Sequence, residues 1–212
     1  MCSINSENVL CVAGGSHGND DNSVESFSIT VGSKGGDLSF EPSKQSLLPF
    51  NHPRSDPAHV MKDDVLYVMG GTQQNIPISS CEAFNTVTNE RVTMPDINHP
   101  RSYPTAVFYD DEIVVIGGAD SEQLSMKSAE YFSFKTNSWE AFPPLNVPRH
   151  GHTACVMNGM IFVFGGNALR QTAGVRSVEM LRSYEVYDRE SARWSLYHDL
   201  HVPKHCKAAF PI

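Results

Sequence analysis

Four copies of one pattern follow each other along the chain, and this repetition constrains the fold more than any other feature. Each copy contains a short run of apolar residues that ends in a pair of glycines. The four pairs are Gly14-Gly15, Gly70-Gly71, Gly117-Gly118 and Gly165-Gly166. A period of about fifty residues indicates supersecondary units that bury their faces against one another.

A basic residue after proline forms a second marker, with a fixed distance to the glycines. The basic residues are Arg54, Arg101, Arg149 and Lys204. The first three each stand sixteen residues before the next glycine pair. Turn-forming residues lie between the two markers, at 63–64, 110–111 and 158–159. This arrangement predicts two antiparallel strands, A and B, joined by a tight turn.

A Glu-x-aromatic triplet is the third marker and predicts strand C. The triplets begin at Glu25, Glu82, Glu130 and Glu185. A tryptophan follows the last two aromatics by seven residues, at Trp139 and Trp194, and marks strand D. By the same count Arg91 and Lys44 hold this place in the second and first repeats. Four strands per unit at this period predict an all-β propeller, in which both faces of each B strand lie against neighbouring blades.

Taken together, the markers resemble those of kelch-repeat β-propellers over nearly the whole length. The fourth repeat is the best match, and the third follows with Ile-Gly-Gly, Ala-Glu-Tyr-Phe and Asn-Ser-Trp. The first two repeats lack the tryptophan, and the first carries extra residues around 31–43 that we interpret as a long C–D loop. The resemblance implies one domain over residues 1–212, with repeats at 1–54, 55–101, 102–149 and 150–204 and a terminal strand at 205–212.

The two ends of the chain raise the question of ring closure. The first repeat begins at its strand B, whereas the residues after Lys204 align with a strand A. We therefore consider a ring of four four-stranded blades in which 208–210 pair with 9–13. The alternative is a partial propeller, because kelch propellers usually have six blades. An open arc exposes an apolar sheet face and is expected to self-associate.

In kelch proteins that recognise peptides, the binding rim resembles what the D–A and B–C loops build here. A ring of guanidinium groups suits a peptide that bears carboxylate or phosphate. In the alternative interpretation each basic residue pairs with an acid or carbonyl of its own blade. The candidate rim residues are Arg54, Arg101, Arg149, Lys204, His17, Gln73, Asn75, Asp120, Ser121, Asn167, Arg170 and Arg176.

The B–C loop of the fourth repeat, residues 167–183, is the longest of these loops. It contains Arg170, Arg176 and Arg182, and few acidic residues. We interpret it as the element that sets specificity for a partner. The alternative is a solvated insertion without function.

Charge and cysteine content limit the classes of partner. The net charge is −8, which argues against a nucleic-acid-binding face. We find no apolar segment long enough to span a membrane. The five cysteines are scattered, without a Cys-x-x-Cys pair, and favour free thiols in the cytoplasm.

Enzymatic chemistry is not expected from this sequence, and neither a cofactor nor a metal is predicted. The histidines at 150, 152, 198, 201 and 205 fit no standard zinc pattern. We find no nucleophile elbow, phosphate-binding loop or dinucleotide fingerprint. An alternative is a small-molecule propeller enzyme that acts in the central channel. Another is a truncated paralogue without function, which the missing tryptophans favour.

The predicted function is a protein–protein interaction module that binds a protein or peptide. The resemblance implies two finer roles: an adaptor that recognises substrates for a cullin-3 ubiquitin ligase, or a protein that binds actin and the cytoskeleton. The ligase role requires BTB and BACK regions, which we do not recognise in this sequence.

Overall fold

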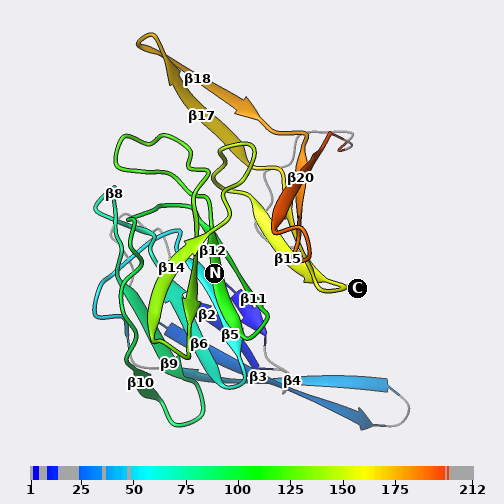
Figure 1. The fold of residues 1–212 in the computed structure, drawn as a ribbon. Coiled ribbons are helices and arrows are strands. Elements are labelled where there is room, and N and C mark those ends of the chain that lie inside the picture. Colours follow the sequence, from blue (N-terminus) through cyan, green and yellow to red (C-terminus); the bar gives the residue numbers. More distant parts are fainter. Residues whose placement is uncertain are drawn as a thin grey trace.

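The computed structural model describes residues 49–198 and Leu200 in full, together with the backbone of four strands nearer the N-terminus. Its strands form four antiparallel sheets of four strands each and two small two-stranded sheets. The described residues contain no helix, and hence none that could cross a membrane. The predicted all-β fold with four-stranded blades is confirmed (Figure 1).

Blade one shows two departures from the prediction. It consists of β1 (Cys2–Ile4), β2 (Val9–Ala13), β3 (Val24–Lys34) and β4 (Asp37–Ser46). β2 pairs with β1 on one side and β3 on the other, so the expected pairing of 9–13 with the C-terminal strand is wrong. Residues 208–210 themselves lie outside the described part of the chain. The extra residues around 31–43 continue β3 and β4 as a long ladder that reaches Lys34 opposite Asp37, rather than forming a loop.

Blades two to four repeat one order of strands, A to D. Blade two contains β5 (Ala58–Lys62), β6 (Val65–Met69), β9 (Cys81–Asn85) and β10 (Glu90–Val92). Blade three contains β11 (Thr105–Tyr109), β12 (Glu112–Ile116), β13 (Ala129–Ser133) and β14 (Ser138–Phe142). Blade four contains β15 (Thr153–Met157), β16 (Met160–Phe164), β19 (Tyr184–Asp188) and β20 (Arg193–Tyr197). Strands β1, β5, β11 and β15 contact one another in succession, so the blades follow one another in chain order.

Two of the B–C connections contain hairpins of their own. In blade two, β7 (Thr72–Gln73) pairs with β8 (Ile76–Pro77). In blade four, β17 (Asn167–Thr172) pairs with β18 (Val175–Met180). The segment expected as a long loop after Gly166 is thus a regular two-stranded element, and it projects from blade four (Figure 1).

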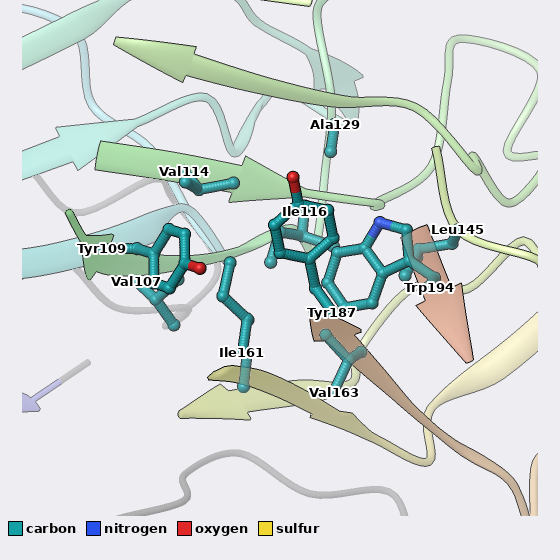
Figure 2. Packing of buried hydrophobic residues seen from close by; sticks show 11 residues of the cluster. Val107, Tyr109, Val114, Ile116, Ala129, Leu145, Ile161, Val163, Tyr187 and Trp194 are labelled. Carbon is teal, nitrogen blue, oxygen red and sulfur yellow. The ribbon is translucent and has the colours of Figure 1, made fainter. Parts of the chain in front are cut away.

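The cores lie between the blades, as the apolar B strands predicted. In β12, residues 113–116 are fully buried along their whole length. Ile113 and Val115 pack in the cluster shared with blade two, whereas Val114 and Ile116 pack in the cluster shared with blade four. Figure 2 shows the second cluster, in which Trp194 of blade four closes one side. Burying each aliphatic side chain contributes roughly 1.5–3 kcal/mol, so the sheets are stabilised mainly by stacking.

The glycine pairs are the points at which neighbouring blades touch through their backbones. Gly117 and Gly118 have φ of +58° and +103°. A Cβ on Gly118 would lie 2.8 Å from the carbonyl oxygen of Ser102, and the Gly118 N–H donates to the Arg149 carbonyl of the next blade at 2.9 Å. The predicted need for close backbone packing and positive φ is confirmed here.

Candidate interaction rim

The repeated arginines lie inside the blades. We call the three pairs Arg54–Glu82, Arg101–Glu130 and Arg149–Glu185 the Arg–Glu clasps. Their guanidinium groups are fully buried and lie 2.7, 2.5 and 2.7 Å from the glutamate oxygens. The prediction that these three arginines present their charge on a rim is therefore wrong, and the alternative, an acid within the blade, describes them.

Each clasp also ties the glycine pair to strand C. Arg101 shows the pattern: its Nη1 donates to the carbonyl of Gly117 at 2.8 Å and to that of Ser128 at 2.9 Å. The guanidinium therefore joins the carbonyl of the first glycine to the carbonyl just before strand C, which also accepts the Gly117 N–H at 3.0 Å. Removing either member of such a buried pair leaves the other charge buried without a partner, which lowers the free energy of unfolding by about 3–5 kcal/mol.

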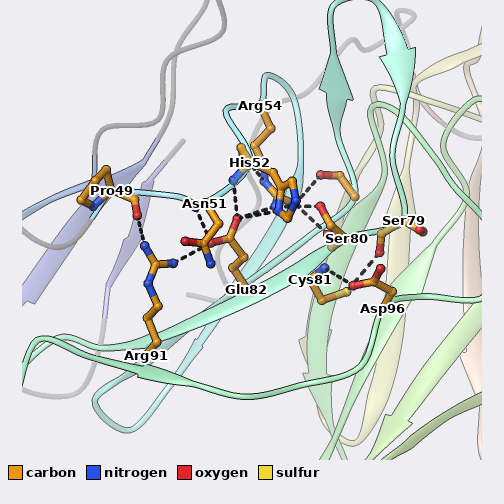
Figure 3. A network of polar contacts seen from close by, with 11 residues as sticks. Pro49, Asn51, His52, Arg54, Ser79, Ser80, Cys81, Glu82, Arg91 and Asp96 are labelled. Carbon is orange, nitrogen blue, oxygen red and sulfur yellow. Dashed lines mark hydrogen bonds and ion pairs between the residues drawn. The ribbon is translucent and has the colours of Figure 1, made fainter.

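The glutamate of each clasp in turn fixes the linker that enters its blade. In blade two, the Glu82 carboxylate accepts N–H groups from Asn51 at 2.7 Å and His52 at 3.1 Å (Figure 3). Burial opposes ionisation of Glu82, but these N–H groups and Arg54 outweigh it and lower the pKa of the carboxyl. Burial likewise lowers the pKa of Arg54, Arg101 and Arg149, although the paired glutamates counteract it.

Arg91 takes over the contacts of the tryptophan that blade two lacks. In blades three and four the indole Nε1 donates to a proline carbonyl in the preceding linker, Trp139 to Pro95 and Trp194 to Pro143. Arg91 donates to the carbonyl of Pro49 in the same way, and to Glu82 Oε2 at 2.8 Å (Figure 3). Its guanidinium lies 5.1 Å from the Phe84 ring centroid. The place counted from the sequence is confirmed by the pairing of Arg91 with Phe84.

The D–A and B–C segments meet at one end of the blades, and we call this surface the interaction rim. In blades two to four, the residue after each arginine bridges to the residue after the glycine pair: Ser55 to Thr72, Ser102 to Ala119, and His150 to Asn167. Neighbouring blades are joined as well, because the Ser125 N–H donates to the Leu169 carbonyl at 3.0 Å. The rim is therefore continuous between blades three and four.

Tyr103 is a rim residue that was not predicted from the sequence. It occupies the second position after Arg101, and its counterparts are Asp56 and Gly151. All three residues have positive φ, of 48°, 52° and 60° in chain order. The N–H of Gly151 donates to the carbonyl of Tyr103, and the N–H of Tyr103 donates to that of Asp56, so the three form a backbone ladder between blades. Tyr103 is 40% exposed, and burial together with the nearby Asp56 raises its pKa. The glycine at the same place in the fourth repeat is the signal that could have identified this position.

The other predicted rim residues fall into two groups. Asn75, Ser121, Arg170 and Arg176 are exposed at this end of the blades. Gln73, Asp120 and Asn167 are half-buried, and the Asp120 carboxylate caps its own loop through the N–H groups of Glu122 and Leu124. His17 and Lys204 lie outside the described residues. Whether any of them contacts a partner stays a prediction.

Among the histidines and cysteines of the described region, His152 and Cys81 are buried and Cys155 is half-buried. His152 is buried beside Gly117, and burial with the nearby Arg149 and His150 holds its pKa well below the ordinary value, so the ring is neutral. Cys81 and Cys155 are free thiols, and burial raises the pKa of Cys81 to about 12. Within residues 49–198, no group of three His, Cys, Asp or Glu side chains could hold a metal ion.

Four-stranded blades, inter-blade glycine contacts and buried Arg–Glu clasps together define a kelch-type β-propeller. The family model for the KLHDC2/KLHL20/DRC7 Kelch-repeats domain matches residues 1–205, so the chain belongs to this family. Kelch repeats of this type are generally protein-interaction modules.

Comparison with other proteins supports the fold. The solved structure of YjhT has a TM-score of 0.71 and 13% sequence identity, with the match covering 95% of this chain and 66% of that one. The likeness shows the architecture alone, and this chain spans about two thirds of the YjhT structure's length. A comparison with curated proteins found no match.

Proposed function

We propose that this chain is a protein-binding module whose protein or peptide partner docks on the interaction rim. The observation that carries the proposal is the conformation of Tyr103. A left-handed backbone costs a side-chain-bearing residue roughly 1–2 kcal/mol relative to glycine, which stands at the same place in blade four. Strain of this kind concentrates at functional sites. A half-exposed aromatic held there is a suitable contact residue for a partner.

The difference between the inside and the rim of the blades also supports the proposal. The strongly repeated polar side chains are engaged in the Arg–Glu clasps, which build the scaffold. The B–C segments differ from blade to blade: β7–β8 carries an exposed Ile76, the next segment is a compact turn, and β17–β18 is a long hairpin. Differing loops on a repeated scaffold are the usual basis of specific recognition.

The test is affinity capture from cell extract with Tyr103→Gly, accompanied by thermal unfolding. We expect the free energy of unfolding of the variant to stay within about 1 kcal/mol of the wild type, because relief of the positive φ offsets the lost ring contact with His150. The variant should nevertheless lose partners that the wild type captures. Phe134→Ala is the matched control, because Phe134 is 41% exposed but follows β13, at the other end of the blade. An unchanged partner list for Tyr103→Gly would contradict the proposed rim.

Two finer roles follow from the kelch resemblance, namely substrate recognition for a cullin-3 ubiquitin ligase and binding to actin. Both are supported by membership of a kelch family. Co-sedimentation with filamentous actin tests the second, and identification of the captured proteins tests the first. We propose that the chain has no catalytic activity of its own and acts in the cytoplasm. The clasps support the first statement, since they engage the buried acids Glu82, Glu130 and Glu185; the free thiols support the second.

A further inference from the structure

The hairpin of blade four is built as a rigid projection. β17 and β18 pair over six residues each and are joined by Ala173 and Gly174, with φ of 49° and 80°. Positive φ at both central residues is typical of a type I′ turn, which matches the twist of the flanking strands. Thr172 and Val175 therefore form the hydrogen-bonded closing pair. Along β18 the residues that direct their backbone groups away from β17 are then Arg176, Val178 and Met180.

Only one edge of this hairpin is covered within the described region. Blade three covers β17, since the Leu169 carbonyl accepts the Ser125 N–H and the Leu169 N–H donates to Ser125 Oγ at 2.8 Å. β18 pairs with β17, and among the described strands none lies along its other edge. All six of its residues are exposed. An uncovered edge strand is a template for the addition of another strand.

The side chains of β18 give this edge a defined chemistry. Arg176, Val178 and Met180 alternate and so share one face of the hairpin, on which Val178 is 62% and Met180 55% exposed. Arg176 donates its Nε to the neutral amide oxygen of Gln171 at 3.2 Å. By contrast, Arg170 on the other face lies 3.8 Å from Glu179. Arg176 thus places a positive charge beside an apolar pair on a chain of net charge −8.

We propose that β18 binds an extended, acidic peptide segment of a partner protein as an additional antiparallel strand. Opposite Met180, Val178 and Arg176, the segment would carry two apolar residues at alternate positions, followed by an acidic residue two positions later. Backbone hydrogen bonds supply affinity in this mode, and alternate side chains supply specificity. The inference rests on the proposed function and names the partner segment that the rim receives.

The probe is a fluorescein-labelled peptide with the sequence Thr-Val-Thr-Val-Thr-Glu-Thr, titrated against the whole chain by fluorescence anisotropy. We expect binding to weaken about tenfold or more when lysine replaces the glutamate, because a charge-assisted contact with Arg176 is lost. The reversed sequence should also bind more weakly, because its acid would lie opposite Met180. Equal binding of the three peptides would overturn the proposal.

Variants of the chain test the same contact from the other side. Val178→Pro removes an outward N–H, which an edge strand tolerates, so the hairpin persists while strand addition is blocked. Arg176→Glu keeps the backbone and reverses the charge. It should weaken binding of the glutamate peptide and strengthen binding of the lysine peptide. Arg193→Glu, an exposed arginine on β20, is the matched control. Peptide binding that persists in both Val178→Pro and Arg176→Glu would overturn the proposal. A dimer of the chain that Val178→Pro dissociates would also overturn it, because β18 would then bind a second copy of the chain.

The two proposals fail in distinguishable ways. If the peptide does not bind while Tyr103→Gly still loses captured partners, then the strand-addition proposal falls and the interaction rim stands. If Tyr103→Gly captures the same partners as the wild type, then the proposed rim is contradicted, whatever the peptide result.

Discussion

Arg91 shows how one residue can replace another of unrelated chemistry at a repeated position. The indoles of Trp139 and Trp194 donate to a linker carbonyl and pack on an aromatic of strand C, at 5.3 Å between ring centroids in both blades. Arg91 keeps both contacts, and its planar guanidinium stacks on Phe84. The missing tryptophan of blade two is therefore a substitution that preserves the linker, and it is not a sign of a decayed repeat.

Variants at residue 91 are expected to separate these contacts. Arg91→Trp keeps a donor for the Pro49 carbonyl and a ring against Phe84, so its free energy of unfolding should stay within about 1 kcal/mol of the wild type. Arg91→Ala loses the hydrogen bonds and the packing and should cost about 1–3 kcal/mol. Urea unfolding measures both values. If the tryptophan variant were as unstable as the alanine variant, the equivalence of the two side chains would be wrong.

Glu82 gives the chain a defined response to acid. Its pKa in the folded state is lowered from the ordinary value of 4.5, so its contribution to stability is complete above that pH and is lost as the pH falls through the folded pKa. Glu82→Gln lacks this titration and leaves Arg54 without its anion. We expect the stability difference between wild type and Glu82→Gln to be largest near neutral pH and to narrow below pH 4.5. Unfolding measured from pH 3 to pH 7 would contradict this if the difference stayed constant.

Among the elements, the strands and their register were predictable because each blade carries local markers. The turn residues, the apolar B strands and the Glu-x-aromatic triplets fix which strands pair, and the count from Trp139 placed Arg91 correctly. The burial of Arg101 was not predictable in the same way. A basic residue after proline is compatible with a solvated rim or with an internal ion pair, and only the three-dimensional proximity of Glu130 distinguishes them. β1 was missed because three residues carry too little periodicity to indicate a strand.

The glycine pair provides a test at the scale of the element. Gly118 and Gly159 both have positive φ, of 103° and 72°, but a Cβ on Gly159 would meet nothing within 4 Å. Gly159→Ala should therefore lower the free energy of unfolding only by the strain of a left-handed backbone, about 1–2 kcal/mol. Gly118→Ala adds a clash with the Ser102 carbonyl, which belongs to the backbone and has little freedom to move. We expect Gly118→Ala to lower the thermal unfolding temperature clearly more than Gly159→Ala does. Equal decreases for the two variants would contradict a role of the glycine pair in blade packing.

At the scale of the whole molecule, each interior sheet is buried on both faces, and blade four differs. Its Ile161 and Val163 face blade three and are fully buried. By the alternation of a strand, Phe162 and Phe164 face the other way, and both are only half-buried. Their rings continue through Tyr184 to Tyr197, which is 42% exposed. In the described part of the chain no further sheet covers this face.

This aromatic face is expected to drive self-association of the chain, because apolar patches of this kind rarely stay exposed on monomers. Light scattering over a range of protein concentrations should show a mass that rises above that of the monomer, and Phe162→Ser with Phe164→Thr should reduce it. The side chains of residues 162 and 164 both point away from blade three, so the core between blades three and four is retained. Val178→Pro is the control, because association through the edge of β18 would respond to that variant instead. A wild-type chain that remains monomeric at every concentration would show that the face is covered within one molecule, which is the arrangement expected of a closed ring.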